Sequence, residues 1–98
     1  MVIQDVIAGL ANAAGPVIKV LSKSDATKII VLGFKKGMML KEHKTGLSTR
    51  LIVIQGQINY HSENGTVTMN KFDDLDIPVN APHSVEALAD SICLLIQG

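Results

Sequence analysis

Hydrophobic residues recur every three or four positions at the start of the chain and about every second position after it. The first pattern falls within residues 1–14 and consists of Val2, Ile3, Val6, Ile7, Leu10 and Ala14. This spacing predicts a short amphipathic helix over residues 1–14, which Gly15 and Pro16 would end. The segment has no Lys or Arg, so we expect it to pack on the domain or on a second subunit and not on a membrane.

From residue 17 onward, short runs rich in β-branched residues alternate with turns rich in Gly, Asn and Asp. These runs predict nine strands, at residues 17–21, 27–34, 38–42, 49–54, 58–61, 66–69, 75–77, 84–88 and 91–96. The Asn64-Gly65 pair is the strongest hairpin signal in the chain. Many short strands in a small chain predict an all-β sandwich or closed barrel over residues 17–98.

The alternation also predicts which side chains face inward. If Thr49 points into the barrel, Leu51 and Val53 do as well, while Ile52 and Ile54 face outward. If His83 points inward, Val85 and Ala87 do so too. The last strand is apolar on both faces. Apolar positions on the outside of a barrel need cover. We expect the helix to cover part of this surface and a sister subunit to cover the rest, which predicts a homodimer.

Composition limits the classes of function. The chain has 98 residues, 47% of them hydrophobic, and its nine basic and nine acidic residues cancel. Without a basic face, and with only Phe34, Tyr60 and Phe72 as aromatic residues, nucleic-acid binding is not expected. No signal peptide or membrane span is expected, and the single cysteine, Cys93, is expected to be a core residue. These features predict a cytoplasmic protein.

Two histidines stand where a small barrel would turn them inward. His43 opens the stretch His-Lys-Thr-Gly-Leu-Ser-Thr, and His83 closes the stretch Ile-Pro-Val-Asn-Ala-Pro-His. Thr45 and Thr49 would stand beside them in the same cavity. A buried polar group without a partner costs about 1–3 kcal/mol. Four such groups inside an apolar barrel therefore imply water, a ligand or mutual pairing. Core histidines with ordinary hydrogen bonds and no ligand are the alternative.

The spacing around these histidines resembles the two motifs of the cupin family. The first motif places His-x-His, Glu and Gly at fixed intervals after a glycine, and this chain reads Gly37, His43, Thr45, Thr49 and Gly56 at those intervals. The second motif places Pro-x-Gly two residues before a histidine, and this chain reads Pro78-Val79-Asn80 before His83. Three positions depart from the second motif: Asn80 replaces the glycine of Pro-x-Gly, Phe72 replaces the opening glycine, and Ala87 replaces the closing asparagine. The resemblance covers about half of the chain and implies a jelly-roll barrel.

The resemblance also implies a metal site, with ligands at the positions of His43, Thr45, Thr49 and His83. Threonine is a weak ligand for a transition metal, and the carboxylate is missing from its position. His43 and His83 alone would hold a metal weakly, so no tightly bound cofactor is expected. His61 is an alternative third donor, although its place beside the hairpin predicts a surface histidine. Glu42 would face away from His43.

The leading hypothesis is a cupin-like barrel that binds a small polar or anionic molecule through His43, Thr45, Thr49 and His83. The alternative is a cupin enzyme of the isomerase, lyase or dioxygenase type, in which His43 and His83 hold a weakly bound divalent metal or transfer protons. A third hypothesis is a sensor barrel that acts through a separate DNA-binding partner. Two lysine pairs, Lys35-Lys36 and Lys41 with Lys44, are expected on the surface, where either could attract an anion. Asp73, Asp74 and Asp76 predict a solvated turn before a strand.

Overall fold

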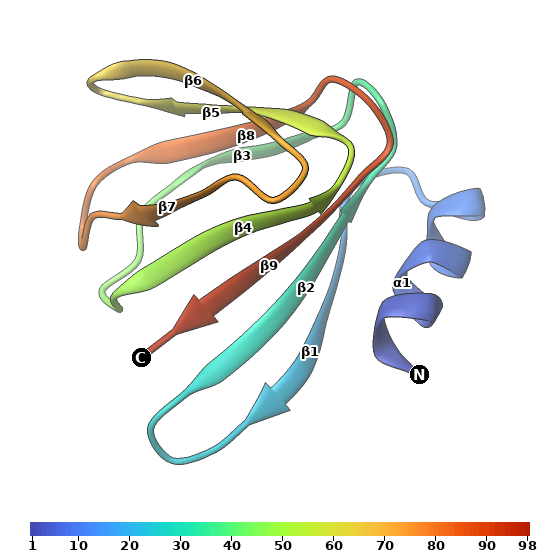
Figure 1. Cartoon of the computed structure of the whole chain (residues 1–98), viewed down its shortest axis with the longest axis horizontal. Helices are drawn as coiled ribbons and strands as arrows, with labels where there is room; N and C mark the ends of the chain where they lie inside the picture. Colours follow the sequence, from blue (N-terminus) through green and yellow to red (C-terminus); the bar gives the residue numbers. More distant parts are fainter.

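A computed structural model describes the whole chain, residues 1–98, as one short helix and nine strands in two sheets (Figure 1). The helices are α1 (Val2–Gly9) and a 3-10 turn, η1 (Leu10–Asn12). The strands are β1 (Val17–Lys23), β2 (Lys28–Phe34), β3 (Met39–His43), β4 (Thr49–Gln55), β5 (Gln57–Ser62), β6 (Gly65–Asn70), β7 (Asp74–Ile77), β8 (His83–Ala87) and β9 (Ser91–Gln97). All nine predicted strands are present, each within two residues of its predicted ends.

The strands form a jelly-roll barrel of two facing antiparallel sheets. One sheet has the order β1-β2-β9-β4-β7, and the other has the order β3-β8-β5-β6. Strands far apart in sequence are neighbours in both sheets: β2 and β4 both pair with β9, and β3 and β5 both pair with β8. The all-β barrel predicted from the strand pattern is therefore confirmed.

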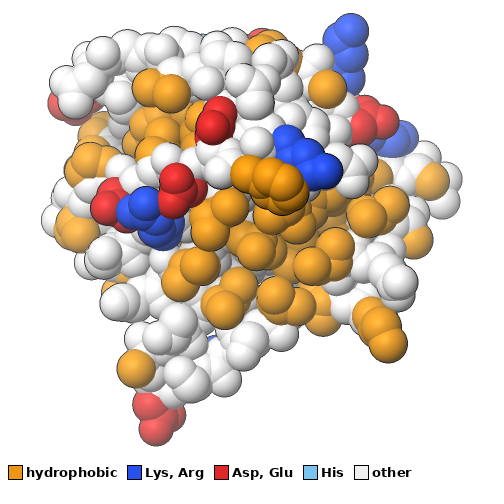
Figure 2. Space-filling view, in the orientation of Figure 1, with side chains coloured by type: hydrophobic (Ala, Val, Ile, Leu, Met, Phe, Trp, Pro, Cys, Tyr) orange, Lys and Arg blue, Asp and Glu red, His pale blue; other side chains and the backbone are white.

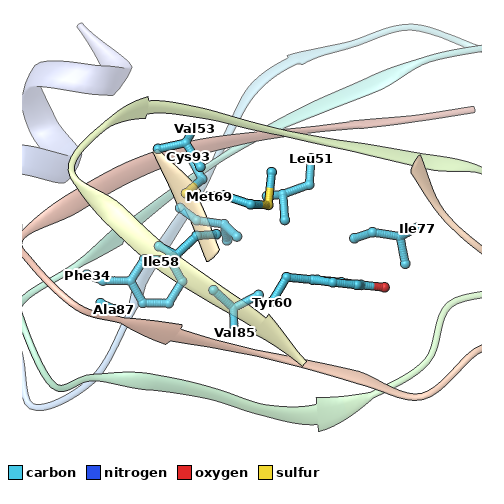
Figure 3. Close-up of a cluster of buried hydrophobic side chains, with 11 residues drawn as sticks. Phe34, Leu51, Val53, Ile58, Tyr60, Met69, Ile77, Val85, Ala87 and Cys93 are labelled. Carbon is cyan, nitrogen blue, oxygen red and sulfur yellow. The ribbon is translucent and has the colours of Figure 1, made fainter. Parts of the chain in front are cut away.

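The hydrophobic core lies between the two sheets and confirms the predicted alternation. Leu51, Val53, Val85 and Ala87 face this core, and Cys93 is fully buried in it (Figure 3). Burial raises the pKa of the Cys93 thiol to about 12, so the thiol is protonated at neutral pH, as a core residue should be. The rest of this cluster consists of Leu32, Phe34, Ile58, Tyr60, Met69 and Ile77.

The helix is shorter than predicted because the chain must leave it to enter β1. Helical structure ends at Asn12, and Ala13 is already extended, with φ −81° and ψ 139°. The apolar face of the helix covers the outside of the larger sheet, where Val6 and Leu10 pack with Val31 and Ile92. As predicted, the helix thus covers part of the apolar outer face. Neither helix has the length and apolar character that crossing a membrane requires.

The sharp turn between β4 and β5 depends on glycine. Gly56 has a φ of +87°, a region that residues with a Cβ rarely adopt. A Cβ at this position would also overlap the carbonyl oxygen of Asp90 and the side chain of Ser91. The hydroxyl of Ser91 accepts a hydrogen bond from the N–H of Gln57 at 3.1 Å, which joins this turn to the start of β9.

Candidate functional site

Strand pairing brings the two predicted histidines into contact. His43, at the end of β3, is the register partner of His83, at the start of β8. Their ring centroids are 4.3 Å apart, and the ring planes are tilted by 59°. The pairing of β3 with β8 thus brings together two motifs that are far apart in the sequence.

A β-bulge in β3 turns His43 toward His83. Leu40 pairs with Val85 and His43 pairs with His83, so two residues, Lys41 and Glu42, stand opposite the single residue Ser84. Regular alternation would place Leu40 and His43 on opposite faces. The extra residue of the bulge puts both on the face of β3 that meets Val85 and His83.

Both imidazole rings are held through Nδ1. The Nδ1 of His43 lies 2.8 Å from the carbonyl oxygen of Lys41, and the Nδ1 of His83 lies 3.0 Å from that of Ala81. A carbonyl oxygen can only accept a hydrogen bond, so Nδ1 carries the proton in each ring. In a neutral ring the lone pair is then on Nε2, which makes no hydrogen bond within the chain. Both Nε2 atoms are therefore free of hydrogen bonds from the chain.

The two histidines differ in burial. His83 is only 3% exposed, whereas His43 is an exposed residue at the end of its strand. Burial lowers the pKa of His83 below its ordinary value of 6.5; the hydrogen bond to Ala81 opposes this shift, and the charge of His43 adds to it. His83 is therefore a neutral hydrogen-bond acceptor near pH 7, and His43 is the ring that solvent and ligands can reach.

Thr45 and Thr49 use their hydroxyl groups within the β3–β4 loop. The Thr45 hydroxyl accepts a hydrogen bond from the N–H of Leu47 at 3.2 Å. The Thr49 hydroxyl donates to the carbonyl oxygen of Leu47 at 3.1 Å. Thr49 is buried and faces inward beside Gln97, as the alternation predicts. Both threonines thus shape the loop that follows His43.

An open hollow of about 370 Å³ lies beside His43, between β3 and the larger sheet. Its polar lining comes from His43, Lys41 and Gln97. Its apolar walls are Ile18, Ile30, Leu32, Leu40 and Leu95. Of the four predicted site residues, only His43 lines this hollow, and the buried His83 lies against the His43 ring.

Tyr60 is a site residue that the sequence analysis did not identify. Its ring stacks on His83, with centroids 5.8 Å apart and planes 25° from parallel. The ring lies in the core, with its hydroxyl directed toward the side where Ile77 lies (Figure 3). That hydroxyl is buried and has no hydrogen-bond partner. Burial raises the pKa of Tyr60, so the hydroxyl keeps its proton. Ile58 and Tyr60 are two residues apart on the same strand, so their side chains point to the same face of the sheet. This spacing is the signal in the sequence that could have placed Tyr60 inside the barrel.

His61 and Glu42 lie outside the barrel. The Nδ1 of His61 is 2.7 Å from the hydroxyl of Thr66, and its Nε2 is 3.2 Å from a carboxylate oxygen of Glu86. Glu42 and His61 line the same surface hollow, which agrees with the predicted outward orientation of both residues. His61 therefore cannot serve as the third donor beside His43 and His83.

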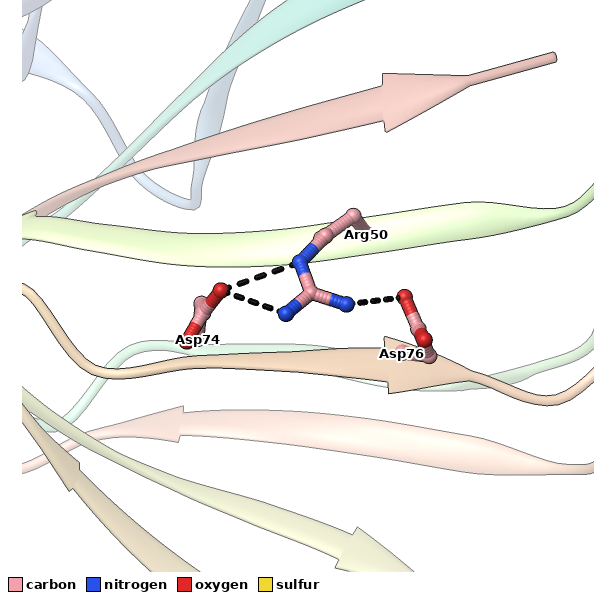
Figure 4. Close-up of polar contacts among 3 residues, drawn as sticks. All are labelled: Arg50, Asp74 and Asp76. Carbon is pink, nitrogen blue, oxygen red and sulfur yellow. Dashed lines mark hydrogen bonds and ion pairs between the residues drawn. The ribbon is translucent and has the colours of Figure 1, made fainter.

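Two aspartates of the predicted acidic turn, Asp74 and Asp76, lie in β7 and form ion pairs that the sequence did not predict. Arg50 of β4 donates hydrogen bonds from Nε and Nη2 to Asp74, at 2.9 and 2.6 Å, and from Nη1 to Asp76, at 2.6 Å (Figure 4). Arg50 and Asp76 are register partners on adjacent strands, which places these charges together on the outer face. All three side chains are well exposed, so the group contributes little to the free energy of unfolding.

The residues present do not make a complete metal site. No three His, Cys, Asp or Glu side chains lie close enough together to hold a metal ion. His43 and His83 are two imidazole donors, whereas catalytic zinc takes three protein donors and non-haem iron takes two histidines and a carboxylate. The side chain of Thr49, at the position of the missing carboxylate, is a neutral hydroxyl bound to Leu47. This donor set does not fit a tightly held transition metal.

Solved structures of cupins superpose closely on this fold. A cupin superfamily protein from Desulfitobacterium hafniense has a TM-score of 0.80 and 19% identity, covering 88% of this chain and 79% of its own. An RmlC-like cupin from Desulfovibrio desulfuricans has a TM-score of 0.79 and 22% identity, covering 91% and 92%. A cupin 2 conserved barrel domain protein from Leptotrichia buccalis has a TM-score of 0.78 and 26% identity, covering 88% and 42%.

The sequence itself matches no protein-family model and no curated protein. The two-sheet topology, the histidine pair across β3 and β8, and the superposition on cupin structures together define the class. The chain folds as a small cupin barrel, which confirms the resemblance seen in its motifs.

Proposed function

We propose that this barrel binds a small molecule with an apolar body and an anionic or polar head group. The observation that carries the proposal is the hollow of about 370 Å³ that has apolar walls and His43 with Lys41 at its polar side. Ligand sites commonly combine apolar walls with a few polar groups that orient the ligand. The size is sufficient for a short-chain carboxylic acid or a small ring.

The polar side of the hollow supports an anionic head group. Lys41 and His43 both line the hollow, and the Nε2 of His43 is free because its Nδ1 is bound to the Lys41 carbonyl. An imidazolium Nε2–H donates to an anion, and a neutral Nε2 accepts from a hydroxyl. The site can therefore bind a hydroxyl or an anionic head group, and an anionic head group is also attracted by the positive charge of Lys41.

The ligand set from the sequence analysis is retained in part in this proposal. His43 contacts the ligand, and His83 supports the His43 ring from the core. Thr45 and Thr49 hold the loop that ends at β4. We also propose that the protein has no resident metal, that it is located in the cytoplasm, and that a second copy of the chain is its partner.

The enzyme alternative is favoured by one observation. Two histidine rings are fixed through Nδ1–H to backbone carbonyls and leave Nε2 free, which is how proteins commonly orient histidines that bind metals. The same arrangement orients a general base. A cupin isomerase, lyase or dioxygenase that uses His43 and His83 is thus the second candidate.

The binding proposal is tested by thermal melts and titration calorimetry with hexanoate, benzoate, gluconate and glucose. At least one compound is expected to raise the melting temperature of the wild type. His43→Ala should lower the affinity about tenfold or more, because it removes the reachable hydrogen-bonding group. His61→Ala is the matched control: it removes a histidine outside the hollow and should bind as the wild type does. No thermal shift with any compound, or unchanged binding by His43→Ala, would refute the proposal.

Elemental analysis separates the two candidates. We expect untagged protein to contain far less than one metal ion per chain, and its melting temperature not to change in zinc, nickel, manganese or iron(II). The reason is the incomplete donor set around His43 and His83. A nearly stoichiometric metal that is lost in both His43→Ala and His83→Ala would instead favour the enzyme.

A further inference from the structure

A second hollow, of about 240 Å³, lies between β6 and β7. These are edge strands of the two facing sheets, and they do not pair with each other. Hydrophobic side chains are visible between the two strands, beside the β5–β6 hairpin (Figure 2). This hollow shares no lining residue with the hollow beside His43. The two are therefore separate sites on the same barrel.

The hydroxyl group of Tyr60 lies at the floor of the second hollow. Tyr60 lines the hollow and is only 5% exposed. Its hydroxyl is directed toward the side of Ile77, the residue that precedes Pro78 of the hollow lining (Figure 3). No group of the chain forms a hydrogen bond with this hydroxyl. Buried polar groups in proteins are nearly always hydrogen-bonded, so the hydroxyl points to a partner from outside the chain.

The rim of this hollow carries a carboxylate that no cation of the chain neutralises. Glu63, in the hairpin turn, lines the hollow, is exposed and forms no ion pair. Asp76 also lines the hollow, but its carboxylate accepts a hydrogen bond from Arg50 at 2.6 Å. The free charge at this rim is therefore negative, whereas Lys41 makes the hollow beside His43 positive.

The walls between the rim and the floor are apolar. They consist of Val67, Leu75, Pro78 and Ala81. Val67 pairs with Tyr60 across the hairpin and is 51% exposed, so its side chain is free to turn aside when a ligand enters. A suitable ligand thus has a cationic end, a short hydrocarbon body and an atom that accepts a hydrogen bond.

We propose that the hollow between β6 and β7 binds a small amino alcohol. Its ammonium group lies beside Glu63, and its hydroxyl oxygen accepts a hydrogen bond from the hydroxyl of Tyr60. Its hydrocarbon body contacts the walls at Val67 and Leu75. The ligand supplies the hydrogen-bond partner that Tyr60 lacks in the free protein.

Titration with 4-amino-1-butanol and with butylamine tests the Tyr60 contact. The two amines differ only in the hydroxyl group, so the ratio of their Kd values isolates that group. Tyr60→Phe keeps the ring and removes the partner. It should reduce the preference for 4-amino-1-butanol over butylamine about fivefold, because one hydrogen bond is lost. Backbone amide shifts in NMR spectra give both Kd values, and the shifts should centre on Ser62, Asn64 and Val67.

Glu63→Gln tests the charge at the rim. It should weaken the binding of both amines about two- to fivefold at low ionic strength and make binding less sensitive to salt, because the ion pair is exposed. Glu42→Gln is the matched control. It also removes an exposed carboxylate, but one that does not line this hollow, and should bind both amines as the wild type does.

Three results would each overturn the proposal. They are a wild type that does not bind 4-amino-1-butanol, amide shifts confined to the hollow beside His43, and the same Kd ratio in the wild type and Tyr60→Phe. Equal effects of Glu63→Gln and Glu42→Gln would refute the placement of the ammonium group. Hexanoate binding at the hollow beside His43 is measured separately, so the two binding proposals stand or fall independently.

Discussion

At the scale of single residues, the interior of this barrel contains two polar side chains that stack on each other. His83 is neutral because burial lowers its pKa, and its Nδ1 is bound to the Ala81 carbonyl. Tyr60 has a buried hydroxyl with no partner. An unpaired buried hydroxyl destabilises a folded protein, so the two residues should respond differently to substitution.

Tyr60→Phe is expected to leave the protein as stable as the wild type or more stable by about 1 kcal/mol, because it removes a hydroxyl that has lost its hydrogen bonds to water. Urea denaturation monitored by circular dichroism measures this change. Tyr60→Ala is the comparison, and it should cost about 3–5 kcal/mol by leaving a cavity in the core. A loss of more than 1 kcal/mol in Tyr60→Phe would mean that the hydroxyl has a bound partner, such as a buried water.

Stability should depend on pH through His83. The unfolded chain takes up this proton near the ordinary pKa of 6.5, and the folded chain takes it up only at lower pH. The free energy of unfolding should therefore decrease as the pH falls from about 6.5 through the lower folded-state pKa, and the His83 contribution should then level off. The titratable groups that face His83 are His43 and Tyr60.

Melting temperatures between neutral and mildly acidic pH check this dependence. His83→Gln should lose less stability on acidification than the wild type, because glutamine does not titrate. His61→Gln is the control and should keep the steeper dependence. Equal pH dependence in the wild type and His83→Gln would contradict the assignment.

At the scale of elements, the helix and the barrel share strands. Val31 of β2 and Ile92 of β9 pack against the helix, while their neighbours Leu32 and Cys93 face the barrel core. Each of these two strands therefore contributes to both clusters. We expect the helix and barrel to unfold together and not as separate units.

Val6→Ala tests this coupling, because Val6 is fully buried between the helix and the sheet. The cost should be about 2 kcal/mol, which lowers the melting temperature by roughly 10 °C in a domain of this size. Tyr60 is the only tyrosine and tryptophan is absent, so Tyr60 fluorescence reports on the barrel core. The melting temperature measured by Tyr60 fluorescence should fall by as much as the melting temperature measured by the circular dichroism of the helix. Gln4→Ala, at an exposed position, is the control, and an unmoved Tyr60 transition in Val6→Ala would show independent units.

At the scale of the whole molecule, the two faces of the larger sheet have different roles. Its inner face, through Ile30, Leu32 and Leu95, forms the wall of the hollow beside His43. Its outer face carries the helix, the Arg50 ion pairs and a group of hydrophobic side chains (Figures 2 and 4). The proposed ligand site therefore lies on the opposite side of this sheet from the helix and the Arg50 ion pairs.

The sequence by itself determined the helix, the nine strands and the facing of Thr49, Leu51, Val53, Val85 and Ala87. Those features depend on residues close together in the chain, because side-chain alternation is a local property of an extended backbone. The motif spacing also placed His43 and His83 in one barrel. Their roles in ligand binding, with those of Thr45 and Thr49, stay predictions.

Only the tertiary structure decided which groups meet. The bulge in β3 sets the ring of His43 against His83, and pairing of β5 with β8 places Tyr60 on the same ring. Pairing of β4 with β7 brings Arg50 to Asp74 and Asp76. These contacts join segments that are distant in sequence, and their register depends on how whole strands align. Local patterns predict the direction of a side chain, whereas its partner depends on the fold.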